Sequence, residues 1–526
     1  MNRTLQRNSI IYVCVVLALL PIIVMRDYTP SNELRYLSIA DEALRNHNFF
    51  AFYNHGEVYA DKPPLYFWLL MLCRSIAGGY HMWILSLFSV LPALGTLKVM
   101  DSWTKDEMDT EHRSLAVLML ITSAFFLGAS IILRMDMLMT FFIVLSLREF
   151  WRMYNAEDCQ GRSRWLFPVY LFLALFSKGP LGLLIPLCAT AAYLVVSKRL
   201  KSFFRYWGWR TWGVLAVLCA LWFAGIYAEG GQQYLDNILV HQTVGRAVNS
   251  FHHKAPFYYY LLHIWYCAAP WSLLAAGVLT VSLRPKFVRS DLQRFFQTVF
   301  VSGFVLLSCI SAKLQIYILP VLPFFIYLTA MFVSRIGTKR WVRLAISVPS
   351  LAFALALPVL LLALSQDEVF AWGGGFIYAA ATILSIRGLS ALWSLYAQKD
   401  TSVEYVIRHL SIGMLLAVFV GGWAMPRINR KMSYGKICTK ALEAAAEYKT
   451  NDFRTWNLPR TESMDVYLDA SVRVIPLDSM PVSGNGKRYI LITRKGSVSQ
   501  LNAASRAVTV GDYAVIPFNE NNNDNN

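Results

Sequence analysis

Residues 315–334 read QIYILPVLPFFIYLTAMFVS and contain no charged side chain. A stretch of about 20 apolar residues is long enough to cross the hydrocarbon core of a bilayer as a helix. Similar segments occur on both sides of it along the chain. They lie at 9–25, 81–100, 114–133, 137–153, 165–177, 179–197, 211–228, 257–283, 295–310, 344–364, 371–396 and 409–424. The sequence therefore predicts a polytopic α-helical membrane protein with about 13 transmembrane helices.

The composition supports this fold class and excludes others. Of the 526 residues, 56% are hydrophobic and 15% are charged, whereas soluble domains have about 45–50% and about 25%. The net charge of +17 lies mostly in short loops and not in a compact basic domain, so a nucleic-acid partner is not indicated. The eight cysteines include no CxxC pair. Neither a disulfide framework nor a structural zinc site is therefore predicted.

Lysine and arginine are distributed unevenly between the loops. If the N-terminus lies inside, the inside loops hold 22 of these residues and the outside loops hold 9. The positive-inside rule favours this orientation, and an odd number of spans then places the C-terminus outside. The segment 64–78 is apolar but short and is interrupted by Arg74, so it is predicted to lie at the membrane surface instead of crossing.

The C-terminal part differs in sequence pattern from the transmembrane part at 1–424, because the long apolar segments end at 424. Residues 425–518 are predicted to form a small extracytoplasmic α/β domain, and the polar tail NENNNDNN at 519–526 is predicted to be disordered. Within the domain we expect an amphipathic helix and short strands. The helix is expected at 433–449, and the strands are expected at 464–470, 472–477 and 487–494.

Polar residues gather on the predicted outer face, where ionisable groups beside a bilayer are costly and mark candidate sites. In the first outer loop, at 26–80, Glu33 and Arg35 open a helix-like stretch, and Asp61 and Lys62 stand directly before two prolines. The prolines fix the chain as it enters the next apolar segment. Lys62 and Arg35 suit a lipid-linked phosphate. The alternative is an interfacial helix with ordinary snorkelling charges.

Two further candidates stand at the ends of spans. Asp136 begins a span directly after Arg134, as either an acid favoured by the helix dipole or a catalytic acid. Lys178 precedes Gly179 and Pro180 in a tight turn. A turn explains the glycine and the proline, but it does not explain a lone outer cation.

The remaining candidates lie in the loop at 234–257 and near the next outer end of a span. The loop contains His241, Arg246 and the adjacent pair His252-His253. Adjacent histidines rarely reach one ion, so this pair does not predict a metal site. Lys313 and Tyr317 follow at the outer end of a span.

Six stretches carry a family resemblance. They are NELRY at 32–36, YADKPPLYFW at 59–68, RMDMLMTFF at 134–142, SKGPLG at 177–182, VHQTVGR at 240–246 and SAKLQIYILP at 311–320. In order, spacing and loop location they resemble the 4-amino-4-deoxy-L-arabinose transferases of lipid A and the protein O-mannosyltransferases (glycosyltransferase family 39). The resemblance implies the GT-C membrane glycosyltransferase architecture, with thirteen spans and a periplasmic α/β domain.

The resemblance also implies substrates and site residues. The donor would be a sugar on undecaprenyl phosphate and the acceptor a phosphate or sugar of lipid A, used at the periplasmic side of the bacterial inner membrane. The donor phosphate would be held by Lys62, Arg246 and Tyr317, and the cavity lined by Arg35, Tyr36, Lys178 and Lys313. Asp136 matches a functionally important acid. Asp61 and His241 match positions associated with a divalent ion in relatives, with Asp61 in place of a more usual Glu.

One position departs from the family pattern. Relatives usually carry an Asp-Glu pair where this chain has Asn32-Glu33, and asparagine cannot act as a base. Three explanations remain open. Glu33 or Asp27 takes the catalytic role; the acceptor is a phosphate monoester, whose second pKa of about 6 already makes it an anionic nucleophile; or activity is lost.

The expected reaction is a direct displacement at the anomeric carbon, with Lys62 and Arg246 stabilising the charge on the leaving phosphate. Within the same enzyme class, a protein O-glycosyltransferase is the alternative, because no sequence motif defines the acceptor pocket. A lipid or solute transporter is the rival from another class. Transporters tend to show internal repeats and charges at mid-membrane, whereas here the polar clusters gather at one face and no repeat is visible.

Overall fold

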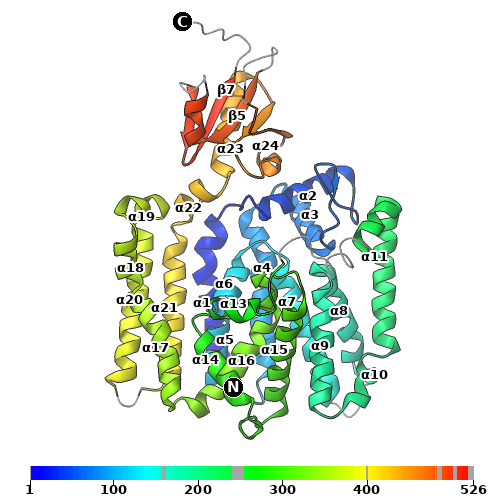
Figure 1. Cartoon of the computed structure of the whole chain (residues 1–526), viewed down its shortest axis with the longest axis vertical. Helices are drawn as coiled ribbons and strands as arrows, with labels where there is room; N and C mark the ends of the chain where they lie inside the picture. The colour runs from blue at the N-terminus through cyan, green and yellow to red at the C-terminus, as the bar shows by residue number, and fades with distance from the viewer. Residues whose placement is uncertain are drawn as a thin grey trace.

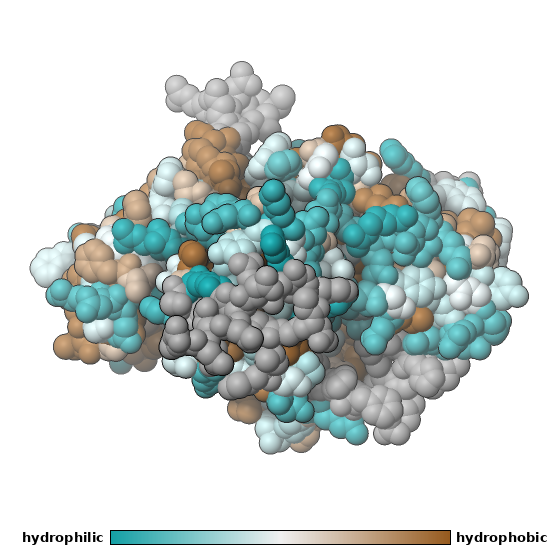
Figure 2. Space-filling model, turned by 90° about the horizontal axis from the view of Figure 1, so that it is seen from above, coloured by the Kyte–Doolittle hydropathy of each residue, from teal (hydrophilic) through white to brown (hydrophobic). Residues whose placement is uncertain are grey.

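The computed structural model describes residues 2–155, 161–239, 254–398, 401–479, 481, 488–501 and 506–518. Figure 1 shows a bundle of roughly parallel helices with a small sheet domain at one end. The helices α2 (Glu33–Asn46) and α3 (Leu65–Ala77) lie at that same end, below the sheet domain. Viewed from that end, the surface is largely hydrophilic (Figure 2), which agrees with contact with water.

The bundle contains helices of very different length. In its first half these are α1 (Asn2–Met25), α4 (Met82–Trp103), α5 (Thr110–Ile121), α6 (Ala124–Ile131), α7 (Asp136–Asn155), α8 (Ser163–Lys178), α9 (Leu181–Val196), η1 (Leu200–Ser202), α10 (Phe203–Tyr206) and α11 (Trp209–Asp236). In its second half they are α13 (Tyr259–Cys267), α14 (Ser272–Ser282), η3 (Pro285–Phe287), α15 (Asp291–Cys309), η4 (Gln315–Val321), α16 (Leu322–Ile336), α17 (Arg340–Ala354), α18 (Ala356–Ala363), α19 (Gln366–Trp372), α20 (Gly375–Tyr396), α21 (Val403–Gly422) and α22 (Met425–Met432).

The number of membrane spans is lower than the sequence predicted. Within the described residues, six helices are long and apolar enough to cross a membrane. They are α4, α11, α15, η4 together with α16, α20 and α21. The pairs α5/α6 and α17/α18 bend by 68° and 44° and raise the count to eight if each pair is one span. The prediction of a multi-pass membrane protein is confirmed, but thirteen spans is too high by this criterion.

Four of the other five predicted spans fall short for physical reasons. The fifth is α1, a helix of 24 residues in which Ile10–Met25 is the apolar part. The helices α8 and α9 have only 16 residues each. The 20 residues of α7 include four charged side chains, among them Asp136 and Glu149. The predicted span at 257–283 is broken into α13, with 9 residues, and α14, with 11. The surface segment predicted at 64–78 forms α3, whose 13 residues are too short to cross.

The hydrophobic core is centred on α16. In the span Gln315–Ile336, 89% of the apolar window is buried, whereas the figure for Trp209–Leu239, which contains α11, is 22%. A helix that is apolar on all sides belongs inside a bundle or against lipid. Accordingly α16 is enclosed by other helices, and α11 stands at one edge of the bundle (Figure 1).

The C-terminal domain is a five-stranded mixed sheet with one helix packed on it. The strand order is β4-β3-β5-β7-β6; β3 is parallel to both neighbours and the remaining pairs are antiparallel. The strands are β3 (Phe453–Trp456), β4 (Val472–Ile475), β5 (Tyr489–Arg494), β6 (Val508–Val510) and β7 (Tyr513–Phe518), and α23 (Gly435–Tyr448) packs on β5 and β7. The predicted helix at 433–449 and strands at 472–477 and 487–494 are therefore confirmed.

The strand predicted at 464–470 is wrong. These residues form the end of η5 (Glu462–Met464) and α24 (Asp465–Leu468). Because β3 and β4 are parallel neighbours, the chain between them has to cross over the sheet, and these two short helices are part of that crossover. The tail predicted to be disordered, 519–526, lies outside the described residues.

The sheet domain rests on the first loop of the chain. Asp465 accepts a hydrogen bond of 2.9 Å from the Ser38 hydroxyl of α2, and it lies 3.3 Å from Nε2 of His55. His55 occupies the turn between β1 (Tyr53–Asn54) and β2 (Glu57–Val58). The Tyr467 hydroxyl donates to Asp27 over 2.6 Å. These contacts tie α2 and its following loop to the sheet domain.

Candidate active site

A cavity of about 360 Å³ brings together four of the residues predicted from the sequence. They are Asp61, Lys62, Lys178 and Tyr317, which come from the first loop, the end of α8 and η4. The rest of the lining is mostly apolar. It consists of Ala60, Pro63, Gly179, Pro180, Leu181, Leu184, Trp222, Ile238, Leu306, Cys309, Ile310 and Ala312.

The loop that carries Asp61 and Lys62 is anchored to α11 by a carboxylate. Glu229 accepts hydrogen bonds from the backbone N–H groups of Phe49 (2.9 Å), Phe50 (2.6 Å) and Ala51 (3.0 Å). Hydrogen bonds to a charged acceptor are stronger than neutral ones. Glu229 therefore holds three consecutive backbone groups at the edge of the cavity.

Tyr234, which follows the break in α11 at Gly231, continues this anchor. Its phenol is buried, accepts from the Phe52 N–H (2.9 Å) and donates to the Tyr59 carbonyl (2.9 Å). Tyr59 is two residues before Asp61. The backbone approaches α11 closely because Gly230 has no side chain: a Cβ there would lie 2.9 Å from the Ala51 methyl. The position of Lys62 thus depends on α11.

Lys178 is held by a buried carboxylate. Since α7 and α8 pack as neighbours joined by a short connection, the start of α7 and the end of α8 meet at one end of the bundle. There Asp136, 1% exposed, forms an ion pair with Lys178 and accepts a hydrogen bond of 3.1 Å from Nε of Arg134. The Lys178 ammonium lies 4.5 Å from the centre of the Tyr317 ring. The carboxylate is thus shared by two cations, so this cluster carries a net positive charge.

The turn after Lys178 requires glycine. Gly179 has φ 117° and ψ −157°, a conformation that residues with a side chain adopt only under strain. The glycine lets the chain turn directly after the lysine, which keeps the ammonium at the cavity.

Glu33 lies outside the cavity lining and is already fully engaged. It is 1% exposed. Its carboxylate accepts hydrogen bonds from Arg26 (2.6 Å) and from the backbone N–H groups of Thr29 (2.8 Å) and Leu133 (2.8 Å). This arrangement joins the start of α2 to the segment that leads into α7.

Arg35 and Tyr36 belong to α2 and also do not line the cavity. Arg35 lies 5.6 Å from the Tyr59 ring and 5.8 Å from the Tyr36 ring. Tyr36 packs edge-on against Tyr66 and Phe67, and burial raises the pKa of its phenol. Arg35 thus lies beside the loop that carries Lys62, whereas Tyr36 packs on α3.

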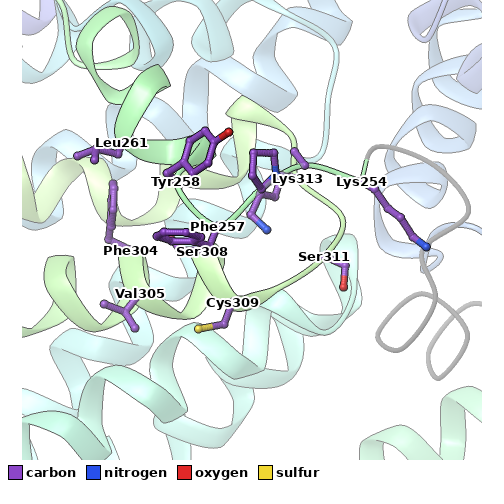
Figure 3. A pocket seen from close by; sticks show the side chains of 12 residues that line it. Lys254, Phe257, Tyr258, Leu261, Phe304, Val305, Ser308, Cys309, Ser311 and Lys313 are labelled. Atoms are coloured by element: carbon purple, nitrogen blue, oxygen red, sulfur yellow. The ribbon is translucent and has the colours of Figure 1, made fainter.

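The remaining predicted residues divide into two groups. Lys313 lines a neighbouring groove and not this cavity (Figure 3). Arg246 and His241 lie outside the described residues. In the part of the chain that the structure describes, no group of three or more His, Cys, Asp or Glu side chains is placed to hold a metal ion. The divalent ion expected at Asp61 and His241 therefore stays a prediction.

Sequence reasoning missed the anchor made by Glu229 and Tyr234. The one available signal was an acid at the end of an apolar span, directly before Gly230 and Gly231. That signal reveals neither the partner segment nor its backbone N–H groups.

The fold and this cavity define a multi-pass membrane protein with the ArnT fold. The crystal structure of ArnT from Cupriavidus metallidurans bound to undecaprenyl phosphate matches 97% of this chain and 97% of its own, with a TM-score of 0.76 and 16% identity. The apo structure of the same protein matches equally well, with a TM-score of 0.76.

Curated relatives agree with this likeness. The chain is 26% identical over 314 residues to the undecaprenyl phosphate-alpha-4-amino-4-deoxy-L-arabinose arabinosyl transferase of Edwardsiella ictaluri, covering 58% of this chain and 55% of the relative. It is 24% identical over 458 residues to a transferase of the same description from Pseudomonas fluorescens, covering 82% and 77%. An uncharacterized protein of Aquifex aeolicus is 26% identical over 337 residues, covering 62% and 64%.

The matched region thus spans less than two thirds of the Aquifex and Edwardsiella proteins. No family model matches the chain. The resemblance to the aminoarabinose transferases that the sequence motifs indicated is nevertheless confirmed by both the relatives and the fold.

Proposed function

We propose that this protein is a membrane glycosyltransferase that moves a sugar from undecaprenyl phosphate to lipid A or a related envelope lipid. The sugar would be 4-amino-4-deoxy-L-arabinose or a related one. The observation that carries the proposal is the cavity in which Lys62, Lys178 and Tyr317 converge within an apolar lining. The relatives' activity and the ArnT fold support it.

The cavity suits the phosphate end of a lipid-linked donor. Two ammonium groups and a phenol provide charge-assisted and neutral hydrogen bonds to phosphate oxygens. Leu184 and Trp222 provide an apolar surface beside them, which suits a prenyl chain and limits access of water to the donor. Arg246 is proposed as a further phosphate ligand.

The donor's phosphate becomes more negative as it leaves, and the cations stabilise that charge. Lys62 is placed by the anchored loop, and Lys178 by its ion pair with Asp136. Fixed charges of this kind need no reorganisation during the reaction. In this account Asp136 orients the cations and is not the base, because its carboxylate is occupied by Lys178 and Arg134.

The hydrogen bonds of the two candidate bases, Glu33 and Asp27, favour one of the three explanations for Asn32. Glu33 is engaged with Arg26 and two backbone groups. Asp27 is engaged with the hydroxyls of Ser433 and Tyr467, both at 2.6 Å. We therefore favour a phosphate monoester as acceptor, because it is already largely an oxyanion at neutral pH.

The proposed step is balanced without an added base. An acceptor phosphate oxygen forms a bond to the anomeric carbon, and the bond from that carbon to the donor phosphate oxygen breaks. The electron pair leaves with undecaprenyl phosphate, whose charge Lys62 and Lys178 stabilise. No proton needs to be removed from an acceptor dianion.

A transfer assay in proteoliposomes tests this function. Undecaprenyl phosphate-linked aminoarabinose is the donor, and lipid A is compared with phosphatase-treated lipid A. We expect transfer to intact lipid A only, and loss of transfer in Lys62→Met but not in Lys339→Met, a control at an exposed position. Equal transfer by Lys62→Met and Lys339→Met would show that Lys62 does not take part in the reaction and would refute the proposed active site.

Asp61 provides a separate check of the nucleophile, because it is the acid among the described residues that line the cavity. If the acceptor phosphate attacks unaided, Asp61→Asn retains most of its transfer rate in the absence of added metal. Abolished transfer with unchanged donor binding would instead assign the base to Asp61.

A further inference from the structure

A small cavity of about 110 Å³ lies at the end of the bundle opposite to the sheet domain, away from the candidate active site. The start of α8, the short helix α10 and the start of α11 meet there (Figure 1). We call this cavity the arginine pocket. Its described lining residues are Met153, Arg164, Phe204, Arg205, Tyr206, Gly208, Trp209, Arg210 and Thr211.

Three arginines from three different helices line the arginine pocket. Arg164 belongs to α8, Arg205 to α10 and Arg210 to α11, and none of the described lining residues is acidic. Nε of Arg164 is buried and has no hydrogen-bond partner among the described residues. Leaving a buried donor of a charged group unpaired is costly. The pocket is also smaller than the roughly 300–1,000 Å³ of cavities that enclose a whole small molecule, so it suits one small anionic group.

The start of α11 adds backbone donors to the arginine pocket. The residue before the helix is Gly208, and no side chain caps the helix there. A Cβ at Gly208 would lie 2.3 Å from the Phe204 carbonyl oxygen, so a capping serine or aspartate does not fit. The first N–H groups of a helix lack partners within it and carry partial positive charge. An anion in the pocket can accept hydrogen bonds from them.

The surrounding chain holds the arginine pocket in shape. Trp207, between α10 and α11, is fully buried, and its indole donates to the Thr190 hydroxyl of α9 over 2.9 Å. The Thr211 hydroxyl donates to the Tyr206 carbonyl over 2.6 Å, which closes the turn into α11. The pocket is therefore formed before a ligand enters, which lowers the entropic cost of binding.

The segments around the arginine pocket carry an excess of positive charge. Residues 148–164 and 198–210 contain nine Lys and Arg but three Asp and Glu. Glu149 is engaged with Arg152 (2.8 Å) and the Ser163 hydroxyl (2.6 Å). The other two acids, at 157 and 158, lie outside the described residues. Six cations remain even if each acid neutralises one, so the partner that matches this surface is an anion from outside the chain.

Exposed aromatic and apolar side chains continue from the arginine pocket along α11. Phe204 and Trp209 line the pocket and are 77% and 78% exposed. Val217 and Leu221 are also exposed, and α11 is apolar enough to cross a membrane while little of it is buried in the bundle. Tryptophan favours the interface between headgroups and acyl chains. The anion that fits both surfaces is the headgroup of a membrane lipid.

We propose that the arginine pocket binds the phosphate of an anionic phospholipid, with the acyl chains along the exposed face of α11. The lipid belongs to the leaflet opposite to the sheet domain, which the predicted orientation makes the cytoplasmic leaflet. It joins the start of α8 to the start of α11. Toward their other ends these two helices carry Lys178 and the Glu229 anchor, so the lipid braces the pair that positions the cations of the active-site cavity. The proposal needs no assumption about the substrates of the enzyme.

Native mass spectrometry of the full-length protein tests this site. The protein is released from nanodiscs that contain equal amounts of phosphatidylglycerol and phosphatidylcholine. We expect the wild type to retain phosphatidylglycerol preferentially, and the double variant Arg164→Gln/Arg210→Gln to bind it at least tenfold more weakly, since one hydrogen bond to a charged group contributes about that much. Arg340→Gln, at an exposed position at the start of α17, should bind it like the wild type.

Two further arms make the result decisive. If the double variant does not fold, Arg205→Gln at an exposed position repeats the test. Inorganic phosphate added at the concentration of the lipid phosphate should not displace the lipid, because it lacks the contacts with α11. Equal retention of the two lipids by the wild type, or an equal loss in Arg340→Gln, would overturn the proposal. Displacement by inorganic phosphate would also overturn it, because the pocket would then bind phosphate without regard to the lipid.

Discussion

Replacing Asp136 with asparagine removes the carboxylate that Lys178 and Arg134 share. The substitution is nearly isosteric, but it leaves two neighbouring cations, and the Lys178 side chain is only 7% exposed. Removing one partner of a buried ion pair costs about 3–5 kcal/mol. Because Arg134 is 27% exposed and is partly screened by water, we expect the lower end, about 3 kcal/mol.

A double-mutant cycle separates the structural part of this effect from the chemical part. Lys178→Met alone leaves Asp136 paired with Arg134, so it should destabilise less than Asp136→Asn. The double variant removes one charge of each sign and should recover most of the lost stability. Thermal unfolding in detergent, followed by tryptophan fluorescence, gives the order of the three variants.

Transfer activity should not follow stability through this cycle. Lys178 lines the cavity, so we expect the double variant to fold well yet to transfer the sugar at least tenfold more slowly than the wild type. This corresponds to a loss of about 1.4 kcal/mol in transition-state stabilisation. The reasoning is refuted if the double variant regains near-normal transfer, because Lys178 and Asp136 would then serve only the fold.

Three further perturbations follow from the geometry. Glu229→Ala removes the acceptor of three backbone hydrogen bonds; it should raise hydrogen exchange at 49–62 and the KM for the donor, whereas Asp236→Ala on the same helix should change neither. Gly179→Ala forces a side chain into a backbone conformation that costs about 1–3 kcal/mol, so transfer should fall while Gly213→Ala, in mid-helix with open space, leaves it intact. The hydrogen bond with Asp465 raises the pKa of His55, so its contribution is present below the unfolded pKa of about 6.5 and is lost as pH rises through the folded pKa. Exchange in α24, corrected for intrinsic rates, should therefore increase with pH in the wild type, and an identical increase in His55→Gln would contradict this.

The fold class was predictable because the apolar segments are local signals. The segment at 315–334 predicts a membrane helix by composition alone, and it forms the most buried of the six candidate spans among the described residues. The number of spans was not predictable in this way. Apolar length in sequence does not reveal where a helix breaks, as at 268–271 between α13 and α14, or bends, as between α5 and α6.

The candidate site was predictable where motif residues carry the chemistry. Lys62, Lys178 and Tyr317 are far apart in sequence but line one cavity. The partners of those residues were not predictable, because backbone groups leave no sequence signature. Glu33 looks like a catalytic acid by its type and place, yet its carboxylate is occupied by Arg26, Thr29 and Leu133. The motif around Lys313 predicted that its side chain lines the active-site cavity. In the structure Ala312 lines that cavity, and Lys313, the next residue, lines the neighbouring groove.

The central claim is that this cavity uses a lipid-linked sugar to modify a phosphorylated lipid. Mass spectrometry of total lipid extracts from cells that express either the wild type or Lys62→Met tests it most directly. We expect lipid A heavier by one sugar only with the wild type, and accumulation of the undecaprenyl phosphate-linked sugar with the variant. Identical profiles of both lipids in the two strains, at equal protein levels, would contradict it.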